Sequence, residues 1–295
     1  MHPIFYPLAN SMKQKRRWYG YLGAKAMLLC YTASHAQPVI IPAQKQVYKH
    51  QVFWSKIEGH EFFNNSAWGI GADLVLRYRS TVGDNSPFSI RNRLGIRPWI
   101  NYQPHDNFRV SLSPIGYMET NEYMAKPEDL NRPPYHEWRT TFQLFHHHYS
   151  FNKRLMHTFR HRYELRWQER PGNLDDPYRF FTRYRIRYRA RVMLNYKKFY
   201  DDGVVYGMIS NEIGLNIGKN VVMNTFNQNR FYVGAGYRFG NALRAELRYV
   251  NRFRTRGATG FEFDLARGPM VAFYIDKISK VSFREDRLPP VRYYD

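Results

Sequence analysis

The stretch that decides the fold is residues 178–192, YRFFTRYRIRYRARV. Mostly aromatic and aliphatic side chains occupy every second position, and arginines occupy nearly all the positions between them. Successive side chains of a β-strand point to opposite faces, so a strand with this sequence has one apolar face and one cationic face. A half-buried helix cannot produce a period of two, and the stretch therefore predicts a long β-strand. The arginines of its cationic face are Arg179, Arg183, Arg185, Arg187, Arg189 and Arg191.

The same alternation recurs along the chain. Five further segments show it, at residues 68–79, 88–97, 155–168, 230–239 and 242–253. These segments are long enough to cross a bilayer, because about 9–11 tilted strand residues suffice. No stretch approaches the roughly 18 consecutive apolar residues of a spanning helix. The sequence therefore predicts an all-β protein, a single antiparallel transmembrane β-barrel.

Short and long links alternate between these segments. The short links are rich in Asn, Asp or Gly, as tight hairpin turns require. They are found at Asn64-Asn65, His105-Asp106-Asn107, Asn152-Lys153, Asp201-Asp202-Gly203 and Gly240-Asn241. The long links are residues 121–134, 169–176 and 218–228. This alternation is typical of the short periplasmic turns and longer outer loops of bacterial barrels.

The number of strands follows less directly. About eleven can be marked, whereas single-chain bacterial barrels normally have an even number. We therefore expect twelve strands, with ten as the alternative. If the short links are periplasmic, the segment 51–62 descends, and an ascending strand is expected before it, within residues 40–50. The chain thus divides into a lead-in or first strand at 37–50, the barrel at 51–277 and a C-terminal tail at 278–295.

The N-terminal segment has the order of a secretory signal peptide. Basic residues at 13–17 precede a mostly apolar stretch at 18–31, and Ser34-His35-Ala36 supplies a small-x-small cleavage site. We expect residues 1–36 to be removed after Ala36, with Met12 as an alternative start. The only cysteine, Cys30, lies inside this segment, so the mature chain would form no disulfide.

The excess of basic residues indicates which classes of molecule the protein could bind. Lysine and arginine number 45 against 24 aspartate and glutamate residues, giving a formal net charge of +21. Such an excess suggests nucleic acid or an anionic surface as a partner. Export opposes the first of these, because an exported chain does not meet chromosomal DNA. We therefore expect a location in the bacterial outer membrane, with its lipid and lipopolysaccharide as partners, and the oligomeric state stays open.

The cationic strand faces are expected to line the lumen. Candidate anion-binding residues are Arg139, Arg160, Arg162, Arg166, Arg179, Arg183, Arg185, Arg187, Arg189 and Arg191. The acids that share these faces and would pair with them are Glu137, Glu164, Glu212 and Glu246. Glu137 is expected to pair with Arg139, and Glu246 with Arg244 and Arg248. Two interpretations remain open. Surplus guanidinium groups would give a channel or pocket that favours a small anionic solute; alternatively, an internal Arg–Glu network fills a plugged structural or assembly barrel.

The remaining polar residues do not form a known site. The histidines His146, His147, His148, His157 and His161 lack a recognised ligand spacing, so neither a metal nor another cofactor is expected. There is no G-x-S-x-G motif and no arrangement of nucleophile, base and acid. We therefore expect a protein that is not an enzyme, and an outer-membrane enzyme acting on lipid is the least favoured alternative.

Short motifs add a family resemblance. In chain order they are a tryptophan-led hairpin (Trp54 to Trp68), Arg97-Pro98, Glu137-x-Arg139, Arg160-x-Arg162-x-Glu164-x-Arg166 and Asn211-Glu212. Over roughly residues 50–277 their order and spacing resemble domain-of-unknown-function family 2490, bacterial outer-membrane barrels. That family comes without an established activity. The resemblance therefore implies a fold and a location, and no catalytic residues.

Overall fold

The computed structural model describes most of the chain after residue 44. The described residues are 45–64, 66–121, 133–170, 177–194, 203–218, 221, 224–240, 242–255 and 260–280. The expected signal peptide and most of the expected C-terminal tail lie outside them. Among the described residues, no helix has the length and apolar character needed to cross a membrane.

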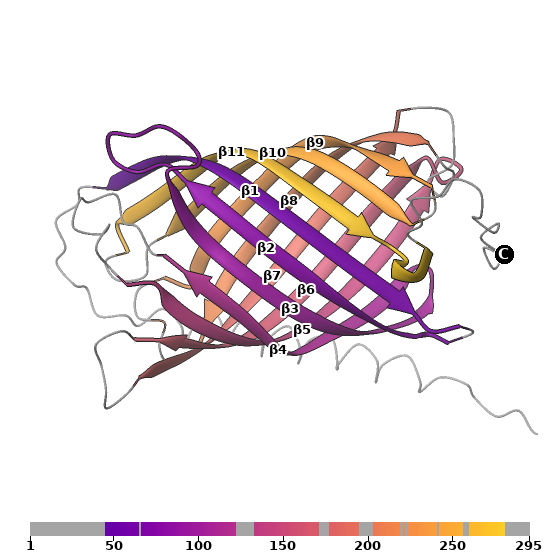
Figure 1. Ribbon diagram of the computed structural model, residues 1–295, viewed down its shortest axis with the longest axis horizontal. Coiled ribbons are helices and arrows are strands. Elements are labelled where there is room, and N and C mark those ends of the chain that lie inside the picture. The colour runs from indigo at the N-terminus through magenta and orange to yellow at the C-terminus, as the bar shows by residue number, and fades with distance from the viewer. Residues whose placement is uncertain are drawn as a thin grey trace, which may run out of the picture. The chain divides into compact units, whose positions relative to one another are not determined.

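Eleven strands form one closed barrel (Figure 1). They are β1 (Gln46–Phe62), β2 (Trp68–Arg79), β3 (Ile90–His105), β4 (Phe108–Thr120), β5 (Tyr135–Ser150), β6 (Leu155–Glu169), β7 (Tyr178–Met193), β8 (Val204–Ile217), β9 (Phe226–Phe239), β10 (Leu243–Thr255) and β11 (Glu262–Ile275), followed by the 3₁₀ turn η2 (Ile278–Lys280). Each strand pairs antiparallel with the next along the chain, and β1 closes the barrel against β11.

The closing pair explains the strand number. Because β1 and β11 run parallel, from Gln46↔Glu262 to Gly59↔Ile275, the wall closes with an odd number of strands. Among the described residues the wall contains eleven strands, between the ten and the twelve that the sequence predicted. Residues 46–50 form no separate ascending strand, because they continue directly into β1. The two closing strands approach closely at Gly268, where a Cβ would lie 1.8 Å from the carbonyl oxygen of Val52.

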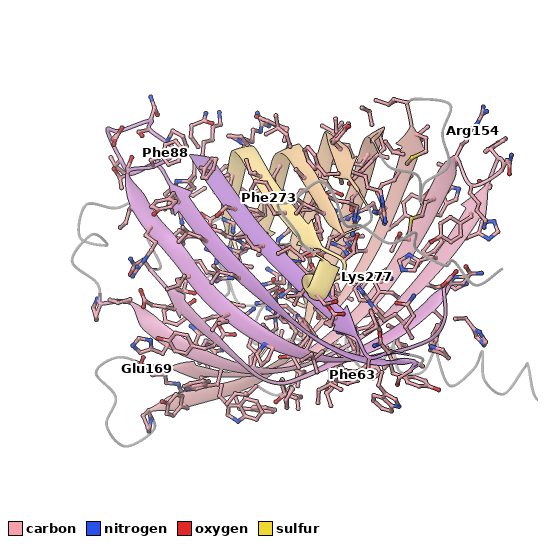
Figure 2. The ribbon with its side chains drawn as sticks, turned by 45° about the vertical axis from the view of Figure 1, so that its right-hand side comes forward. Phe63, Phe88, Arg154, Glu169, Phe273 and Lys277 are labelled. Atoms are coloured by element: carbon pink, nitrogen blue, oxygen red, sulfur yellow. The ribbon has the colours of Figure 1, made fainter. Side chains whose placement is uncertain are left out.

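The wall is apolar outside and polar inside. On β7 the outward side chain of Ile186 is 43% exposed, whereas the inward guanidinium residue Arg185 is 4% exposed. The same holds for Phe273, on the outward face of β11 (Figure 2). The alternation breaks at the bulge between Arg77 and Tyr78 of β2, which places Arg91 opposite the outward Tyr78. The register also shifts between Ile96 and Ile100 of β3, between Ser113 and Gly116 of β4, and between Gly214 and Leu215 of β8.

The links separate the two ends of the barrel. Residues 106–107 and 151–154 connect strands at one end, called here the turn end. The long link at 80–89 lies at the other, the loop end, where β4 ends at Thr120 and β5 begins at Tyr135. Figure 2 shows Phe88 and Glu169 at the loop end, opposite Phe63 and Arg154. The β7–β8 link at the turn end is longer than the tight turn expected there, and only Leu194 and Gly203 of it are described.

Candidate functional site

The interior of the barrel holds more buried cations than anions. Within the described residues, fourteen arginines and six carboxylates are buried. Removing a charge from water is costly unless a partner of opposite sign lies nearby. The buried carboxylates are Asp73, Glu137, Glu164, Glu212, Glu246 and Asp264. The position of each arginine relative to these acids therefore decides what the lumen can do.

Glu137 on β5 joins two arginines. Arg139 Nε donates to Glu137 Oε1 at 2.6 Å, and Arg166 Nη2 donates to Glu137 Oε2 at 2.5 Å. The carboxylate is fully buried, and the two arginines lie directly opposite each other on β5 and β6. The pairing of Glu137 with Arg139 matches the sequence expectation, and Arg166 joins it from the neighbouring strand.

Glu164 on β6 is the centre of the network. Arg185 donates to its Oε2, and Arg97 Nη1 lies 3.5 Å from its Oε1. Arg162 Nη1 and Arg139 Nη1 lie 3.7 Å and 4.0 Å from the same oxygen. Four guanidinium groups from four strands therefore surround one fully buried carboxylate.

Glu212 on β8 extends the network to β9. Arg160 donates to its Oε2, while Arg185 Nη1 and Arg230 Nη1 lie 3.5 Å and 3.0 Å from its Oε1. Arg185 thus bridges Glu164 and Glu212. A continuous series of ion pairs therefore links strands from β3 to β9, and Arg230 is a member that the sequence did not single out.

Glu246 on β10 has one of its two expected arginine partners. Its neighbours are Arg248, which forms an ion pair with it, and Tyr206, whose hydroxyl donates to Glu246 Oε1 at 2.8 Å. Arg244, expected to pair with Glu246, binds Asp276 instead through two bonds of 2.6 Å. Asp276 directly follows β11, the strand next to β10. The alternation along β10 says nothing about residues of the neighbouring strand, so it could not predict this partner.

The arginines of β7 are distributed along the lumen. Arg183, Arg185, Arg189 and Arg191 are buried, Arg187 is half-buried, and Arg179 is exposed near the loop end of the strand. Arg183 Nε donates to Asn216 Oδ1 at 3.2 Å on β8. The stretch therefore places one arginine at the mouth of the barrel and five inside it.

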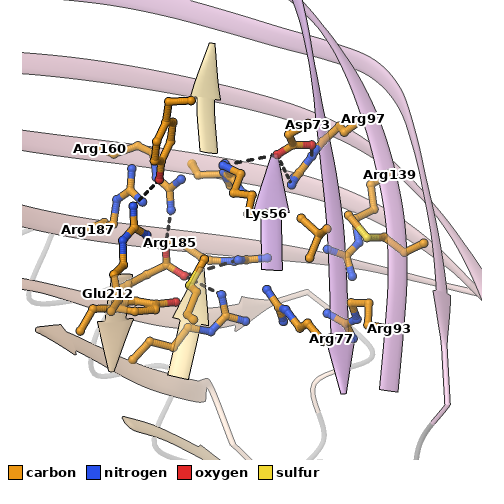
Figure 3. Close-up of a pocket in the computed structure, with 18 residues that line it drawn as sticks. Lys56, Asp73, Arg77, Arg93, Arg97, Arg139, Arg160, Arg185, Arg187 and Glu212 are labelled. Carbon is orange, nitrogen blue, oxygen red and sulfur yellow. Dashed lines mark hydrogen bonds and ion pairs between the residues drawn. The ribbon is translucent and has the colours of Figure 1, made fainter. Parts of the chain in front are cut away.

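An internal cavity lies among these side chains (Figure 3). Its volume is about 70 Å³. Because a cavity needs roughly 10–15 Å³ to hold one water, this one has room for several waters or one small polyatomic ion. Eleven basic and two acidic side chains line it: Lys56, Arg77, Arg93, Arg97, Arg139, Arg160, Arg162, Arg185, Arg187, Arg230 and Arg248, with Asp73 and Glu212.

The strand register places arginines directly opposite one another. Six such pairs occur among the described residues: Arg77–Arg93, Arg139–Arg166, Arg160–Arg187, Arg162–Arg185, Arg230–Arg252 and Arg238–Arg244. Like charges in this position destabilise a sheet. Two unit charges about 5 Å apart repel by roughly 3 kcal/mol at an effective dielectric constant of about 20.

Nearby carboxylates compensate five of these six pairs. Glu137, Glu164, Glu212 or Asp276 lies within 4.0 Å of at least one member of each. The exception is the pair of Arg77 and Arg93. Among the described residues, neither of these guanidinium groups forms an ion pair with a carboxylate, although both line the cavity.

The uncompensated pair borders a buried tryptophan. Trp54 is 1% exposed, and the guanidinium carbon of Arg77 lies 4.1 Å from the centre of its ring. The guanidinium groups of Arg230 and Arg252 lie 5.6 Å and 5.5 Å from the same ring. Such cation–π contacts stabilise the positive charge without neutralising it. We call Trp54, Arg77, Arg230 and Arg252 the Trp54 cluster.

The histidines are divided between the two faces of the wall. His146 and His148 are exposed on the outward face, whereas His147 points inward and its Nδ1 lies 3.1 Å from Thr158 Oγ1. His157 and His161 form outward hydrogen bonds with tyrosine hydroxyls of β7, at 2.7 Å and 2.6 Å. Within the described residues, no group of three or more His, Cys, Asp or Glu side chains could hold a metal ion.

Comparison with known proteins supports the resemblance seen in the motifs. No curated protein matches the chain. The model of a family described as "Protein of unknown function (DUF2490)" matches residues 51–261, which include all the arginines and glutamates predicted to line the lumen. The match spans more than half of the sequence and confirms the family expected from the motifs. The chain therefore belongs to the DUF2490 family.

Proposed function

We propose that this protein is an outer-membrane β-barrel that binds a small anion in the arginine-lined cavity of its lumen. The observation that carries the proposal is the lining itself, with eleven basic and two acidic side chains. Guanidinium groups bind oxyanions through charge-assisted hydrogen bonds, which are strongest where water is largely excluded. The protein on this proposal is a binding protein without a catalytic role.

The outer surface supports a membrane location. Large apolar side chains such as Trp68, Ile96 and Leu247 are 52–63% exposed on the outward face. Strands of 12–17 residues exceed the roughly 9–11 that a tilted strand needs to cross a bilayer. With the short links in the periplasm, the loop end faces the cell exterior and its lipopolysaccharide. The signal-like segment at 1–36 supports export.

A pocket fits the interior better than a wide pore. Glu164 is fully buried and Arg139 is 3% exposed, although both point into the lumen. Side chains that line a water-filled channel remain accessible to solvent. The lumen here is filled by its own side chains around a small cavity, so the proposal favours retention of an anion over rapid passage.

The alternative is a plugged structural or assembly barrel. The observation that favours it is the continuous series of ion pairs in which Arg185 joins Glu164 to Glu212. Such a network replaces a hydrophobic core and cross-links strands that are distant in sequence. On this alternative the surplus arginines would serve only the stability of the wall.

Anion binding and conductance discriminate between the two. The mature chain, refolded in detergent, is titrated calorimetrically with inorganic phosphate, citrate and acetate at constant ionic strength, and its reversal potential is measured in a planar bilayer. Saturable binding with little conductance supports the pocket. An anion-favouring reversal potential with discrete conductance steps would instead indicate a channel. A folded, silent barrel that binds none of the three anions contradicts the proposal and supports the structural alternative.

A further inference from the structure

The uncompensated arginine pair lies near the loop end of the lumen. Arg77 is two residues from the end of β2 at Arg79, and Arg93 is three residues from the start of β3 at Ile90. The register places them directly opposite each other, and both line the cavity (Figure 3). A solute that enters the lumen from this end would therefore reach this pair early.

The donor groups of the pair are only partly used. Nε and Nη1 of Arg77 are buried without a hydrogen-bond partner. Arg93 Nε donates to Thr120 Oγ1 at 3.0 Å, a bond to a neutral hydroxyl. The equivalent pair Arg162–Arg185 has Glu164 against both members. Among the described residues, no carboxylate forms an ion pair with Arg77 or Arg93 in the way that Glu164 does with Arg162 and Arg185.

Trp54 fixes the orientation of Arg77. With the guanidinium carbon 4.1 Å from the ring centre, the indole occupies one side of the group. A guanidinium that stacks on an aromatic ring retains its in-plane N–H donors for another partner. Arg230 lies against the same ring and also lines the cavity. Several planar donor groups therefore border one small space.

This arrangement selects a class of ligand. A tetrahedral oxyanion has several oxygens that can accept hydrogen bonds from different guanidinium groups at once. A single carboxylate has only two, and a halide lacks the directional oxygens that a planar fork matches. We infer that Arg77 and Arg93 form the seat for a phosphate-type oxyanion, either free or as the terminal group of a solute. The inference rests on the proposed function, because it assigns a ligand to the same cavity.

The test is a matched pair of double variants. Arg77→Gln/Arg93→Gln removes the seat, and Arg91→Gln/Arg267→Gln removes the same charge from two exposed positions on the outward faces of β3 and β11. Each full mature chain is refolded in detergent and titrated with inorganic phosphate. We expect the first variant to bind at least about tenfold more weakly than the parent, because bonds to charged groups are lost, and the second to keep the parental affinity.

Further arms separate the possible failures. If the parent binds phosphate and Arg77→Gln/Arg93→Gln binds it equally well, the seat is elsewhere, and the proposed function stands. If the parent binds acetate or citrate but not phosphate, the ligand class is wrong and the pocket remains. If it binds no anion, both proposals fail. Tighter binding of a sugar phosphate than of inorganic phosphate would identify the oxyanion as a terminal group.

A conservative variant guards against misfolding. Arg77→Lys/Arg93→Lys keeps both charges but loses the planar donor forks. Folding is checked by the mobility of unheated barrels in gel electrophoresis. We expect weakened phosphate binding by this folded variant as well. Undiminished binding would overturn the guanidinium seat and leave only a general attraction between the lumen and anions.

Discussion

Two arginine pairs in the same barrel have different surroundings. Arg162 and Arg185 lie opposite each other on β6 and β7, and Arg77 and Arg93 lie opposite each other on β2 and β3. Glu164 forms ion pairs with both members of the first pair, and no described carboxylate forms an ion pair with either member of the second. The same face-to-face placement of two arginines is therefore neutralised by the protein in one case only. On our proposal, the second pair takes its negative charge from a bound anion.

The largest effect should come from removing the acid at the compensated pair. Glu164→Gln removes the negative charge that lies within 4.0 Å of four guanidinium groups. Breaking a buried ion pair by removing one partner typically costs about 3–5 kcal/mol. We expect a loss of this size in the free energy of unfolding, measured by urea denaturation in detergent.

A matched control uses an acid on the opposite face. Glu119 pairs with Arg91, whose side chain is 46% exposed. Glu119→Gln should cost less than about 1 kcal/mol, because exposed ion pairs contribute little. Equal losses in the two variants would contradict the distinction between a structural interior and a weakly coupled exterior.

The comparison requires both arginine pairs to face the lumen. Ile186 lies between Arg185 and Arg187 on the outward face of β7. Ile186→Arg should therefore lower the stability of the barrel in lipid vesicles by about 2–4 kcal/mol if the residue lies near the midplane. Arg179→Lys is a control that adds no charge to the lipid face. An Ile186→Arg variant that inserts and unfolds like the parent would mean that the faces of β7 are reversed.

Phosphate should stabilise the parent and not the variant without the seat. A ligand at 100 times its dissociation constant stabilises the folded state by about 2.7 kcal/mol. We expect a rise of this size in the unfolding free energy of the parent. In Arg77→Gln/Arg93→Gln the rise should nearly vanish at the same phosphate concentration. A rise of equal size in both proteins would place the effect of phosphate outside the pair.

The smallest expected change in unfolding free energy comes from Arg77 and Arg93 when no anion is bound. Without an oxyanion, Arg77→Gln/Arg93→Gln relieves like-charge repulsion and should raise the unfolding free energy by up to about 1 kcal/mol. Arg162→Gln/Arg185→Gln should lower it, because Glu164 loses its partners. Chemical denaturation in phosphate-free buffer measures both changes. A change of the same sign in the two variants would remove the contrast between the pairs.

Alternation in the sequence predicts strands and faces with good precision. The expected segment 68–79 coincides with β2, and 178–192 differs from β7 by one residue. A period of two depends only on the local backbone, so the face of each side chain can be predicted without knowing which strands are neighbours. The same argument correctly placed Glu137 and Arg139 inside the barrel.

The partners of these residues depend on information that alternation lacks. Strand register determines that Arg77 faces Arg93, at the last position before the register shifts at Tyr78. Arg244 was expected to pair with Glu246 and instead binds Asp276, just beyond the adjacent strand. Periodicity reports the face of a side chain, whereas the contents of a site depend on which strands are neighbours and how far they are shifted.

The parallel seam has a consequence for the route of the polypeptide. β1 starts at the loop end with Gln46, and β11 finishes at the turn end with Ile275. A barrel with an even number of up-and-down strands returns the chain to the side on which it started. With eleven, the entry and the exit of the wall lie at opposite ends of the barrel. Assembly in a bilayer would therefore have to carry one end of the barrel domain across the membrane, and an epitope beside Gln46 and one beside Ile275 would be accessible from opposite sides.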